Sequence, residues 1–321
     1  MPIKLKVMRI TDATARIKVY ELADPAGAAL PPFTAGAHLD LELGDALGSG
    51  EERSYSLMND PRETHRYEIA VQREIDSRGG SVWMHDALKV GDIITSSEPL
   101  NNFALNEAGE RHILIAGGIG ITPIIGMARR LAATGSAFDF HYCARDRDVA
   151  AFADALEQEF AGRIKLYFDG GDPSKGLDVK SLLAERPPAG HVYVCGPAGL
   201  IRAVRETTGH WPKGSVHYEL FRGAEDDTAP RSTDTPFEIV LQRSGKQFTV
   251  PAGKSILDVL KGEGYRIKTL CKEGVCGTCR VGLISGIADH RDDVLTDDER
   301  ETDIQVCVSR AMPGETLVLD L

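Results

Sequence analysis

Four cysteines near the end of the 321-residue chain are spaced like the ligands of a metal centre. Cys271, Cys276 and Cys279 follow the pattern C-x4-C-x2-C, and Cys307 stands alone on a later apolar segment. This spacing, with a distant fourth thiolate, is that of a plant-type [2Fe–2S] cluster. Two glycines inside the loop let the backbone approach the sulfides and adopt positive φ. We therefore predict that these four cysteines hold a [2Fe–2S] cluster.

Other interpretations of the cysteines fit less well. Zinc sites favour paired C-x2-C ends or histidine ligands, and this region has one C-x2-C pair. Six cysteines in a chain of this length do not resemble the disulfide framework of a small secreted domain. Cys143, at the end of a predicted strand, is typical of a small core residue.

A glycine-rich turn in the middle of the chain suggests a phosphate site. The segment 117–123 (GGIGITP) follows the apolar run His112–Ala116 and opens a helix, with Thr122 as the expected N-cap and Pro123 at the first helical position. A helix N-terminus offers N–H donors to a pyrophosphate. The turn is not the strict G-x-G-x-x-G fingerprint, and glycine also serves purely steric roles. A second loop, 195–197 (CGP), ends a later strand where open α/β sheets bind ligands, so together they predict a dinucleotide site.

A short extended stretch near the N-terminus combines a cation, a ring and hydroxyls. Arg53 and Tyr55 face one way, and Ser54 and Ser56 the other. The arginine suits a phosphate and the ring a flat heterocycle, although an ordinary edge strand has the same pattern. Further on, the segment 78–81 (RGGS) precedes a predicted helix and offers a cation and an N-cap hydroxyl to a second phosphate.

Three predicted units position these motifs. Residues 1–104 form a mostly antiparallel barrel with one capping helix, and residues 105–223 form a parallel βαβ unit. Residues 224–235 are polar and contain proline, as in a tether. Residues 236–321 form a small mixed β+α domain. The strands expected in the first two units are Ile3–Ile10, Ala15–Glu21, His38–Leu43, His112–Ala116, Phe138–Cys143, Ile164–Phe168 and His191–Val194.

Helices and one hairpin complete the expected elements. In the last unit, two strands flank a turn at Ser244 and Gly245, and Ser255 is placed to cap the next helix. The expected helices are Ser81–Leu88, Pro123–Ala133, Val149–Phe160, Pro197–Thr207 and Ile256–Lys261, and the hairpin strands are Phe237–Gln242 and Gln247–Val250.

Composition limits the partners. Hydrophobic residues make up 42% and charged residues 26% of the chain, as in soluble globular proteins. No window reaches the roughly 18 apolar residues of a membrane span, and the N-terminus lacks the apolar core of a secretory signal. We therefore expect a cytoplasmic protein without membrane contact. The formal net charge of −11 opposes binding to nucleic acid and favours a protein partner with a basic face.

Taken together, the motifs resemble those of the phthalate dioxygenase reductase family, the reductases of Rieske-type oxygenases and O-demethylases such as vanillate demethylase. The resemblance covers essentially the whole chain and its domain order. It implies a flavin barrel, an NAD-binding domain and a C-terminal β-grasp ferredoxin. The matching segments are 53–57 (RSYSL), 78–81 (RGGS), 117–123 (GGIGITP), 195–197 (CGP), 218–221 (YELF) and the four cluster cysteines.

The resemblance also implies the cofactors and their residues. It implies FMN, where sequence physics alone does not separate FMN from FAD. Arg53, Ser54, Tyr55 and Ser56 would surround the isoalloxazine and ribityl phosphate, with Arg78, Gly80 and Ser81 at the phosphate. Phe221 would lie beside the flavin ring, and Gly118, Thr122, Cys195 and Pro197 around the nicotinamide dinucleotide. We assign Ser56, Cys195 and Phe221 to the catalytic hydride-transfer site.

Coenzyme choice depends on one loop after the second predicted strand of the βαβ unit. Asp146 suits the ribose hydroxyls of NADH, whereas Arg145 suits the 2′-phosphate of NADPH. The family resemblance favours NADH.

The expected function is conversion of two-electron to one-electron chemistry, since NADH gives up a hydride and the cluster accepts single electrons. The expected partner of this monomeric reductase is a terminal Rieske non-haem iron oxygenase or O-demethylase acting on an aromatic or similar substrate. A cytochrome P450 partner stays open. Reductases of di-iron monooxygenases usually carry an N-terminal ferredoxin and FAD, which argues against them. A plain electron carrier does not explain the dinucleotide motifs.

Overall fold

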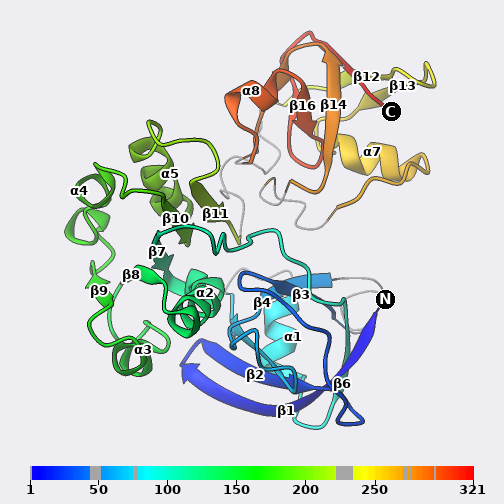
Figure 1. Ribbon diagram of the computed structural model, residues 1–321. Helices are drawn as coiled ribbons and strands as arrows, with labels where there is room; N and C mark the ends of the chain where they lie inside the picture. Colours follow the sequence, from blue (N-terminus) through cyan, green and yellow to red (C-terminus); the bar gives the residue numbers. More distant parts are fainter. Residues whose placement is uncertain are drawn as a thin grey trace. The chain divides into compact units, whose positions relative to one another are not determined.

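The structure is a computed structural model that describes residues 2–43, 52–74, 79–221, 234–269, 274, 277–292 and 294–321. It divides into two compact units, Met1–Glu219 and Leu220–Leu321 (Figure 1). Each unit has its own sheets and its own buried core. Among the described residues, no helix is both long and apolar enough to cross a membrane.

The first unit opens with a curled antiparallel sheet in the order β4-β3-β6-β1-β2-β5, whose two edge strands approach each other. Alternate residues of these strands, such as Leu39 and Leu41, are buried inside. Helix α1 (Gly80–Asp86) packs on this core through Met84, and the Tyr20 hydroxyl donates to the Met84 carbonyl at 2.6 Å. The strands are β1 (Ile3–Thr14), β2 (Ile17–Ala23), β3 (His38–Glu42), β4 (Glu52–Ser56), β5 (Tyr67–Gln72) and β6 (Ile93–Ser96).

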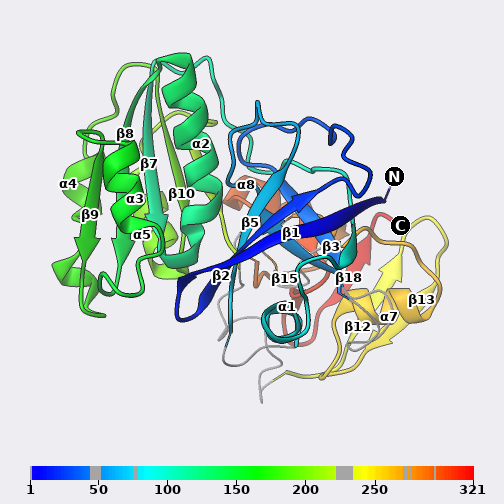
Figure 2. The ribbon, with the colours of Figure 1, turned by 90° about the horizontal axis from the view of Figure 1, so that it is seen from below.

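A five-stranded parallel sheet completes the first unit, in the order β11-β10-β7-β8-β9. Its helices cover both faces, as the predicted βαβ pattern requires (Figure 2). The strands are β7 (Arg111–Gly117), β8 (Ala137–Ala144), β9 (Ile164–Phe168), β10 (Gly190–Cys195) and β11 (Val216–Glu219), and the helices are α2 (Ile121–Thr134), α3 (Ala153–Glu159), α4 (Val179–Leu183) and α5 (Ala198–Thr207).

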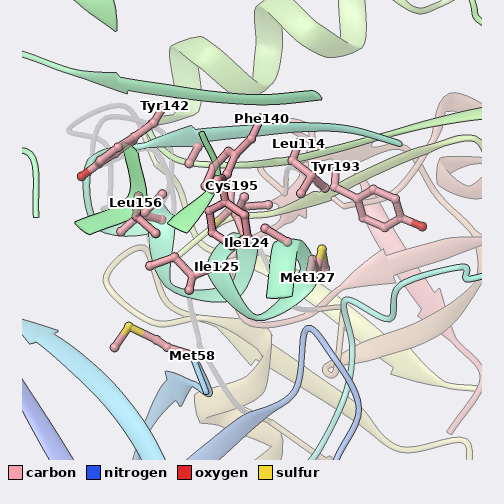
Figure 3. Close-up of a cluster of buried hydrophobic side chains, with 14 of the residues drawn as sticks. Met58, Leu114, Ile124, Ile125, Met127, Phe140, Tyr142, Leu156, Tyr193 and Cys195 are labelled. Carbon is pink, nitrogen blue, oxygen red and sulfur yellow. The ribbon is translucent and has the colours of Figure 1, made fainter. Parts of the chain in front are cut away.

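The main core of this unit lies between the parallel sheet and helices α2 and α3 (Figure 3). Leu114, Phe140 and Tyr193 project from alternate strand positions onto Ile124 and Leu156 of the helices. Met58, which follows strand β4 by two residues, belongs to the same cluster, as do Ile17 and Ala70 of the antiparallel sheet. The two sheets of the first unit therefore meet in one core cluster, and the curled sheet has a second core inside it.

Some predicted boundaries in this unit were wrong, and the reasons are local. Helix α2 begins at Ile121 with Gly120 as N-cap, because residues 118–120 already form a 3-10 turn, so Thr122 lies inside the helix. Helix α3 begins at Ala153 rather than Val149. Strand β11 was not predicted as a strand.

The second unit is a five-stranded mixed sheet in the order β13-β12-β18-β14-β16, with the helix α7 (Ile256–Gly262) burying Ile256, Leu257 and Leu260. Both the predicted hairpin and the Ser255 cap are confirmed, and Asp258 completes a capping box. The remaining elements are β12 (Phe237–Leu241), β13 (Gln247–Val250), β14 (Arg280–Ser285), β15 (Ala288–Asp289), α8 (Asp297–Arg300), β16 (Asp303–Gln305), β17 (Arg310–Ala311) and β18 (Thr316–Leu319).

A buried ion pair lies just before the first strand of the mixed sheet. Asp234, which the sequence assigned to the tether, accepts two hydrogen bonds from the buried Arg291 guanidinium, at 3.0 and 2.6 Å. Arg291 also binds Asp289. The rest of the predicted tether, apart from Thr235, lies outside the described residues.

Candidate functional site

Strand β4 carries the predicted flavin residues and pairs with β3 in an antiparallel register that sets Ser54 opposite Asp40. The Ser54 hydroxyl donates to the Asp40 carboxylate at 2.6 Å. Tyr55 packs against the core of the curled sheet, and burial raises the pKa of its phenol. Ser56, at the end of the strand, is buried.

Two of the predicted phosphate-binding motifs meet at Arg53 and Gly80. A Cβ added at Gly80 would lie 3.1 Å from Arg53 Nε and 3.2 Å from its Cγ. The Arg53 guanidinium also donates to the Glu52 carbonyl at 2.8 Å. Leu43 Cδ1 lies closer still, at 2.8 Å, so the absence of a side chain at position 80 lets Leu43 and Arg53 pack against the first residue of α1. This sets the Arg53 guanidinium beside the start of the helix, and an arginine placed there fits the flavin phosphate.

Ser81 does not cap helix α1, which corrects one sequence expectation. Gly79 takes the cap position with a φ of 101°, and the helix therefore begins one residue earlier than predicted. The Ser81 hydroxyl accepts a hydrogen bond from the Glu74 N–H at 3.1 Å. Arg78, predicted to bind the phosphate, lies outside the described residues.

The predicted dinucleotide loops lie against each other at the carboxyl edge of the parallel sheet. A Cβ at Gly120 would meet the Cys195 carbonyl oxygen at 2.4 Å, and one at Gly196 would meet Gly117 Cα at 2.9 Å. These glycines therefore allow backbone-to-backbone packing. Gly118 differs, because its φ of 54° coincides with open space around its Cβ position. Gly118 therefore leaves room for a ligand such as a pyrophosphate, whereas Gly117 and Gly120 are closely packed.

Other residues of this site have roles that the sequence did not reveal. The Thr122 hydroxyl donates to the Ile119 carbonyl at 3.2 Å and so holds the turn. Pro197 is the N-cap residue of α5. Asp146 accepts hydrogen bonds from the N–H groups of Asp148 and Val149 through one carboxylate oxygen, at 3.1 and 3.2 Å. Its assignment to the ribose stays a prediction.

Glu219 was missed by sequence reasoning although it lies within a quoted motif. The strand register sets it directly opposite Cys195, whose thiol is fully buried. Its Oε2 atom is buried without a hydrogen-bond partner among the described residues, and burial raises the pKa of the carboxyl to about 8. The signal that could have revealed Glu219 is a glutamate at the carboxyl end of a strand that pairs with the strand of Cys195, a predicted nicotinamide-binding residue.

Glu219 should make stability depend on pH. The folded protein keeps a proton that the unfolded chain, at the ordinary pKa of 4.5, releases. This stabilisation is complete below about pH 4.5 and is lost as the pH rises towards 8, at about 1.4 kcal/mol per pH unit between the two values. Glu219→Gln should flatten this slope in urea unfolding, whereas exchange of the exposed Glu206 for Gln should not. An unchanged slope in the Glu219 variant would show that this carboxyl is ionised in the folded state.

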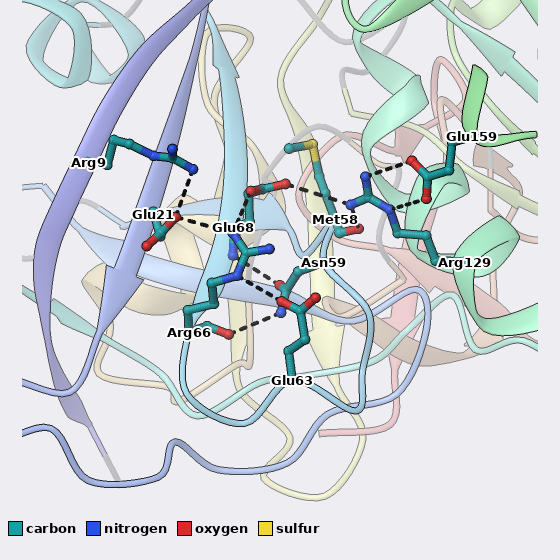
Figure 4. A network of polar contacts seen from close by, with 9 residues as sticks. All are labelled: Arg9, Glu21, Met58, Asn59, Glu63, Arg66, Glu68, Arg129 and Glu159. Atoms are coloured by element: carbon teal, nitrogen blue, oxygen red, sulfur yellow. Dashed lines mark hydrogen bonds and ion pairs between the residues drawn. The ribbon is translucent and has the colours of Figure 1, made fainter. Parts of the chain in front are cut away.

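Arg129 lies on helix α2, which follows the glycine-rich turn, and its side chain contacts both helix α3 and the segment after strand β4 (Figure 4). Its guanidinium donates to the Met58 carbonyl at 2.9 Å and to both carboxylate oxygens of Glu159, at 2.9 and 3.1 Å. Glu68 of β5 lies 3.7 Å away. Because Met58 follows strand β4 by two residues, this contact ties the predicted flavin strand to the dinucleotide helix.

Loss of the Arg129 contacts should loosen the first unit. Arg129→Ala leaves the buried Met58 carbonyl without its charged donor, so we expect a loss of about 1.5–3 kcal/mol in the free energy of unfolding. Arg130→Ala is the matched control. Arg130 lies on the same helix and forms an ion pair with the exposed Glu107, and loss of this exposed pair should cost about 0–1 kcal/mol. Urea unfolding followed by flavin fluorescence measures both, and equal losses would contradict the assignment.

The cluster site is partly described. The β14–β16 ladder sets Arg280 opposite Gln305 and so brings Cys279 and Cys307 together, with their Sγ atoms 2.9 Å apart and both side chains buried. Gly274 and Gly277 have φ values of 72° and 75°, as the loop was predicted to need. Cys271 and Cys276 lie outside the described residues. Two adjacent buried thiols at a glycine-rich loop fit a thiolate-ligated cluster.

Phe221 lies at the start of the second unit and is 38% exposed. Its place beside the flavin ring therefore stays a prediction.

A curled antiparallel sheet sharing its core with a parallel α/β sheet, followed by a ferredoxin unit, defines a modular flavin- and dinucleotide-linked reductase. Residues 239–312 match the 2Fe-2S iron-sulfur cluster binding domain family. The chain is 46% identical to phthalate dioxygenase reductase of Burkholderia cepacia, over 99% of this chain and 97% of that protein. The chain belongs to the phthalate dioxygenase reductase family, which confirms the resemblance and the fold class.

Two solved structures extend the comparison over the whole chain. A phthalate dioxygenase reductase, described as a modular structure for electron transfer from pyridine nucleotides to [2Fe-2S], matches with a TM-score of 0.76 and 45% identity, covering 100% of this chain and 98% of that one. An intact type IV self-sufficient cytochrome P450 monooxygenase matches with a TM-score of 0.78 and 35% identity, covering 100% of this chain and 41% of that one.

Proposed function

We propose that this protein is the reductase component of an oxygenase system, which takes electrons from NADH through FMN and a [2Fe–2S] cluster and delivers them singly to a terminal oxygenase. The observation that carries the proposal is the combination, in one chain, of the open Gly118 turn with a buried cysteine pair in a cluster-binding domain. A dinucleotide site alone would also be found in many dehydrogenases, and a ferredoxin domain alone would also be found in a simple electron carrier. The two features together indicate a reductase.

The residues of the first unit would hold two of the groups. Arg53, Tyr55 and Gly80 would hold FMN, supported by the position of the Arg53 side chain, whose Nε lies 3.1 Å from where a Cβ at Gly80 would be. Gly118 and the N-terminal turn of α2 would receive the pyrophosphate of NADH. When bound, the flavin accepts a hydride from NADH and the cluster accepts one electron at a time.

The chain's own contribution to hydride transfer is a dry and neutral surface at the carboxyl edge of the sheet. Burial keeps the Cys195 thiol protonated and raises the pKa of Glu219, so neither side chain presents a negative charge to the nicotinamide at neutral pH. Ser56 would complete this site from the flavin strand, and Phe221 would cover the flavin ring. For the coenzyme we favour NADH, with Asp146 near the ribose.

The partner is proposed from charge and family. A net charge of −11 suits docking on a basic face of a Rieske non-haem iron oxygenase or O-demethylase that acts on an aromatic or similar compound. We propose a monomer that works in the cytoplasm. The likeness to a self-sufficient cytochrome P450 monooxygenase makes a P450 the second candidate partner, and comparing electron transfer to purified proteins of both kinds separates the two.

Cofactor analysis of the purified protein tests this proposal. Extraction should release about one FMN per chain, and iron and acid-labile sulfide should each approach about two per chain, as a [2Fe–2S] centre requires. FAD in the extract would overturn the flavin assignment. Zinc in place of iron would overturn the electron-transfer function.

A further inference from the structure

Gln305 is a fully buried polar side chain at the cluster site that no part of the proposed mechanism uses. It ends strand β16 two residues before Cys307, and the ladder sets it opposite Arg280, the residue that follows Cys279. Its side-chain oxygen Oε1 lies 2.9 Å from Cys279 Sγ. Gln305 therefore contacts the sulfur of a predicted cluster ligand.

The nitrogen end of this amide differs from the oxygen end. Gln305 Nε2 is buried and makes no hydrogen bond within the part of the chain that the structure describes. A buried N–H group without an acceptor is costly, so the position of this amide requires an explanation. The Cys279 thiol can donate to Oε1 only while it carries its proton.

Cluster binding changes the Cys279 sulfur from a hydrogen-bond donor to an acceptor. A cysteine that ligates iron is a thiolate, which accepts hydrogen bonds and cannot donate one. Rotation of the glutamine amide about its last torsion exchanges Oε1 and Nε2 without moving the strand, because this torsion is broad and roughly two-fold. The same side chain then offers its unused N–H group to the sulfur.

We propose that Gln305 donates an N–H···S hydrogen bond to the Cys279 sulfur of the bound cluster and thereby raises the cluster's reduction potential. The inference rests on the proposed function, since it requires a [2Fe–2S] cluster. Reduction adds one negative charge that the ligand sulfurs share, so a donor stabilises the reduced form more than the oxidised form. Gln305 would thus favour electron transfer from the flavin to the cluster.

Removal of the donor should lower the potential. Gln305→Leu replaces the amide with an apolar side chain of similar size. In this variant the ratio of reduced to oxidised cluster at a fixed potential should fall about tenfold, a shift of about 59 mV for one electron. Gln305→Glu replaces the donor with an acceptor, so the reduction potential of the cluster should fall at least as far. Ile304→Val is the control, because Ile304 is equally buried, alternates with Gln305 along the strand, and carries no hydrogen-bond donor on its side chain.

Redox titration followed by EPR measures the potential, after iron and sulfide analysis has shown that each protein holds its cluster. An unchanged potential in a fully loaded Gln305→Leu protein would overturn the inference and leave the proposed function intact. Absence of a cluster from the wild type would overturn the proposed function instead.

A measurement on the wild type serves if the variants do not assemble a cluster. Glutamine labelled with ¹⁵N in the side chain should show hyperfine coupling to the reduced cluster in pulsed EPR. Gln242 and Gln247, the other glutamines of this unit, lie on or next to strands β12 and β13, so the coupling should persist when each of them is changed to Asn in the cluster-loaded protein. Absence of a coupling in the loaded wild type would refute the hydrogen bond.

Discussion

Replacement of Cys307 by alanine is expected to abolish electron delivery to the oxygenase while NADH oxidation with ferricyanide continues. The variant lacks one thiolate of the predicted cluster, whereas the predicted flavin and dinucleotide residues, apart from Phe221, lie in the separate unit Met1–Glu219. We expect a fall of about 100-fold or more in oxygenase-coupled turnover and a change of less than about twofold in ferricyanide reduction, because a missing ligand disrupts the cluster.

Cys143→Ser is the matched control for this experiment. Cys143 lies on β8 of the first unit, and burial raises the pKa of its thiol to about 12, as expected of a structural cysteine. Both activities should persist in this variant. If the Cys307 variant still drives the oxygenase at a comparable rate, the flavin donates directly to the partner and the ferredoxin unit has another role.

The second large effect is expected from Gly120→Ala. A methyl group there would lie 2.4 Å from the Cys195 carbonyl oxygen and 2.7 Å from the Gly196 nitrogen, and both are backbone atoms that cannot rotate away. The two dinucleotide loops must separate, at a cost of about 1–3 kcal/mol or more. If that cost falls on the binding-competent arrangement, NADH affinity drops about tenfold or more.

Titration of NADH binding, with flavin content as a check on folding, measures this effect. Gly209→Ala in the same unit is the control, since its Cβ would make only ordinary contacts, at 3.6 Å or beyond, and its φ is not positive. Normal NADH affinity in the Gly120 variant, with flavin retained, would show that these loops do not form the dinucleotide site.

Most of the architecture could be predicted from local patterns. The strand periods predicted β1 to β3 of the antiparallel sheet and four of the five strands of the parallel sheet, but not β5 and β6. Ser255 was correctly placed as a cap because the capping box is a local feature. Two caps were wrong for one reason. Gly79 and the 3-10 turn at 118–120 begin their helices earlier, and backbone conformations of this kind leave little trace in residue type. Strand β11 was missed as well, and its four residues are all only half-buried.

The functional residues that sequence reasoning missed depend on distant partners. Arg129 binds the carbonyl of a residue 71 positions earlier, and Gln305 contacts a cysteine 26 positions away. Glu219 is notable only because parallel pairing sets it beside Cys195. No local pattern encodes such contacts, whereas the cysteine spacing is visible because three ligands come from one loop.

The central claim is that electrons from NADH reach an iron–sulfur cluster within this chain. Anaerobic mixing of the purified protein with NADH, followed by rapid freezing and EPR, tests it most directly. We expect the flavin absorbance to fall first and the signal of a reduced [2Fe–2S] cluster then to appear, without any added mediator. If NADH bleaches the flavin but the cluster is reduced only by a chemical reductant, the proposed route from dinucleotide to cluster is contradicted.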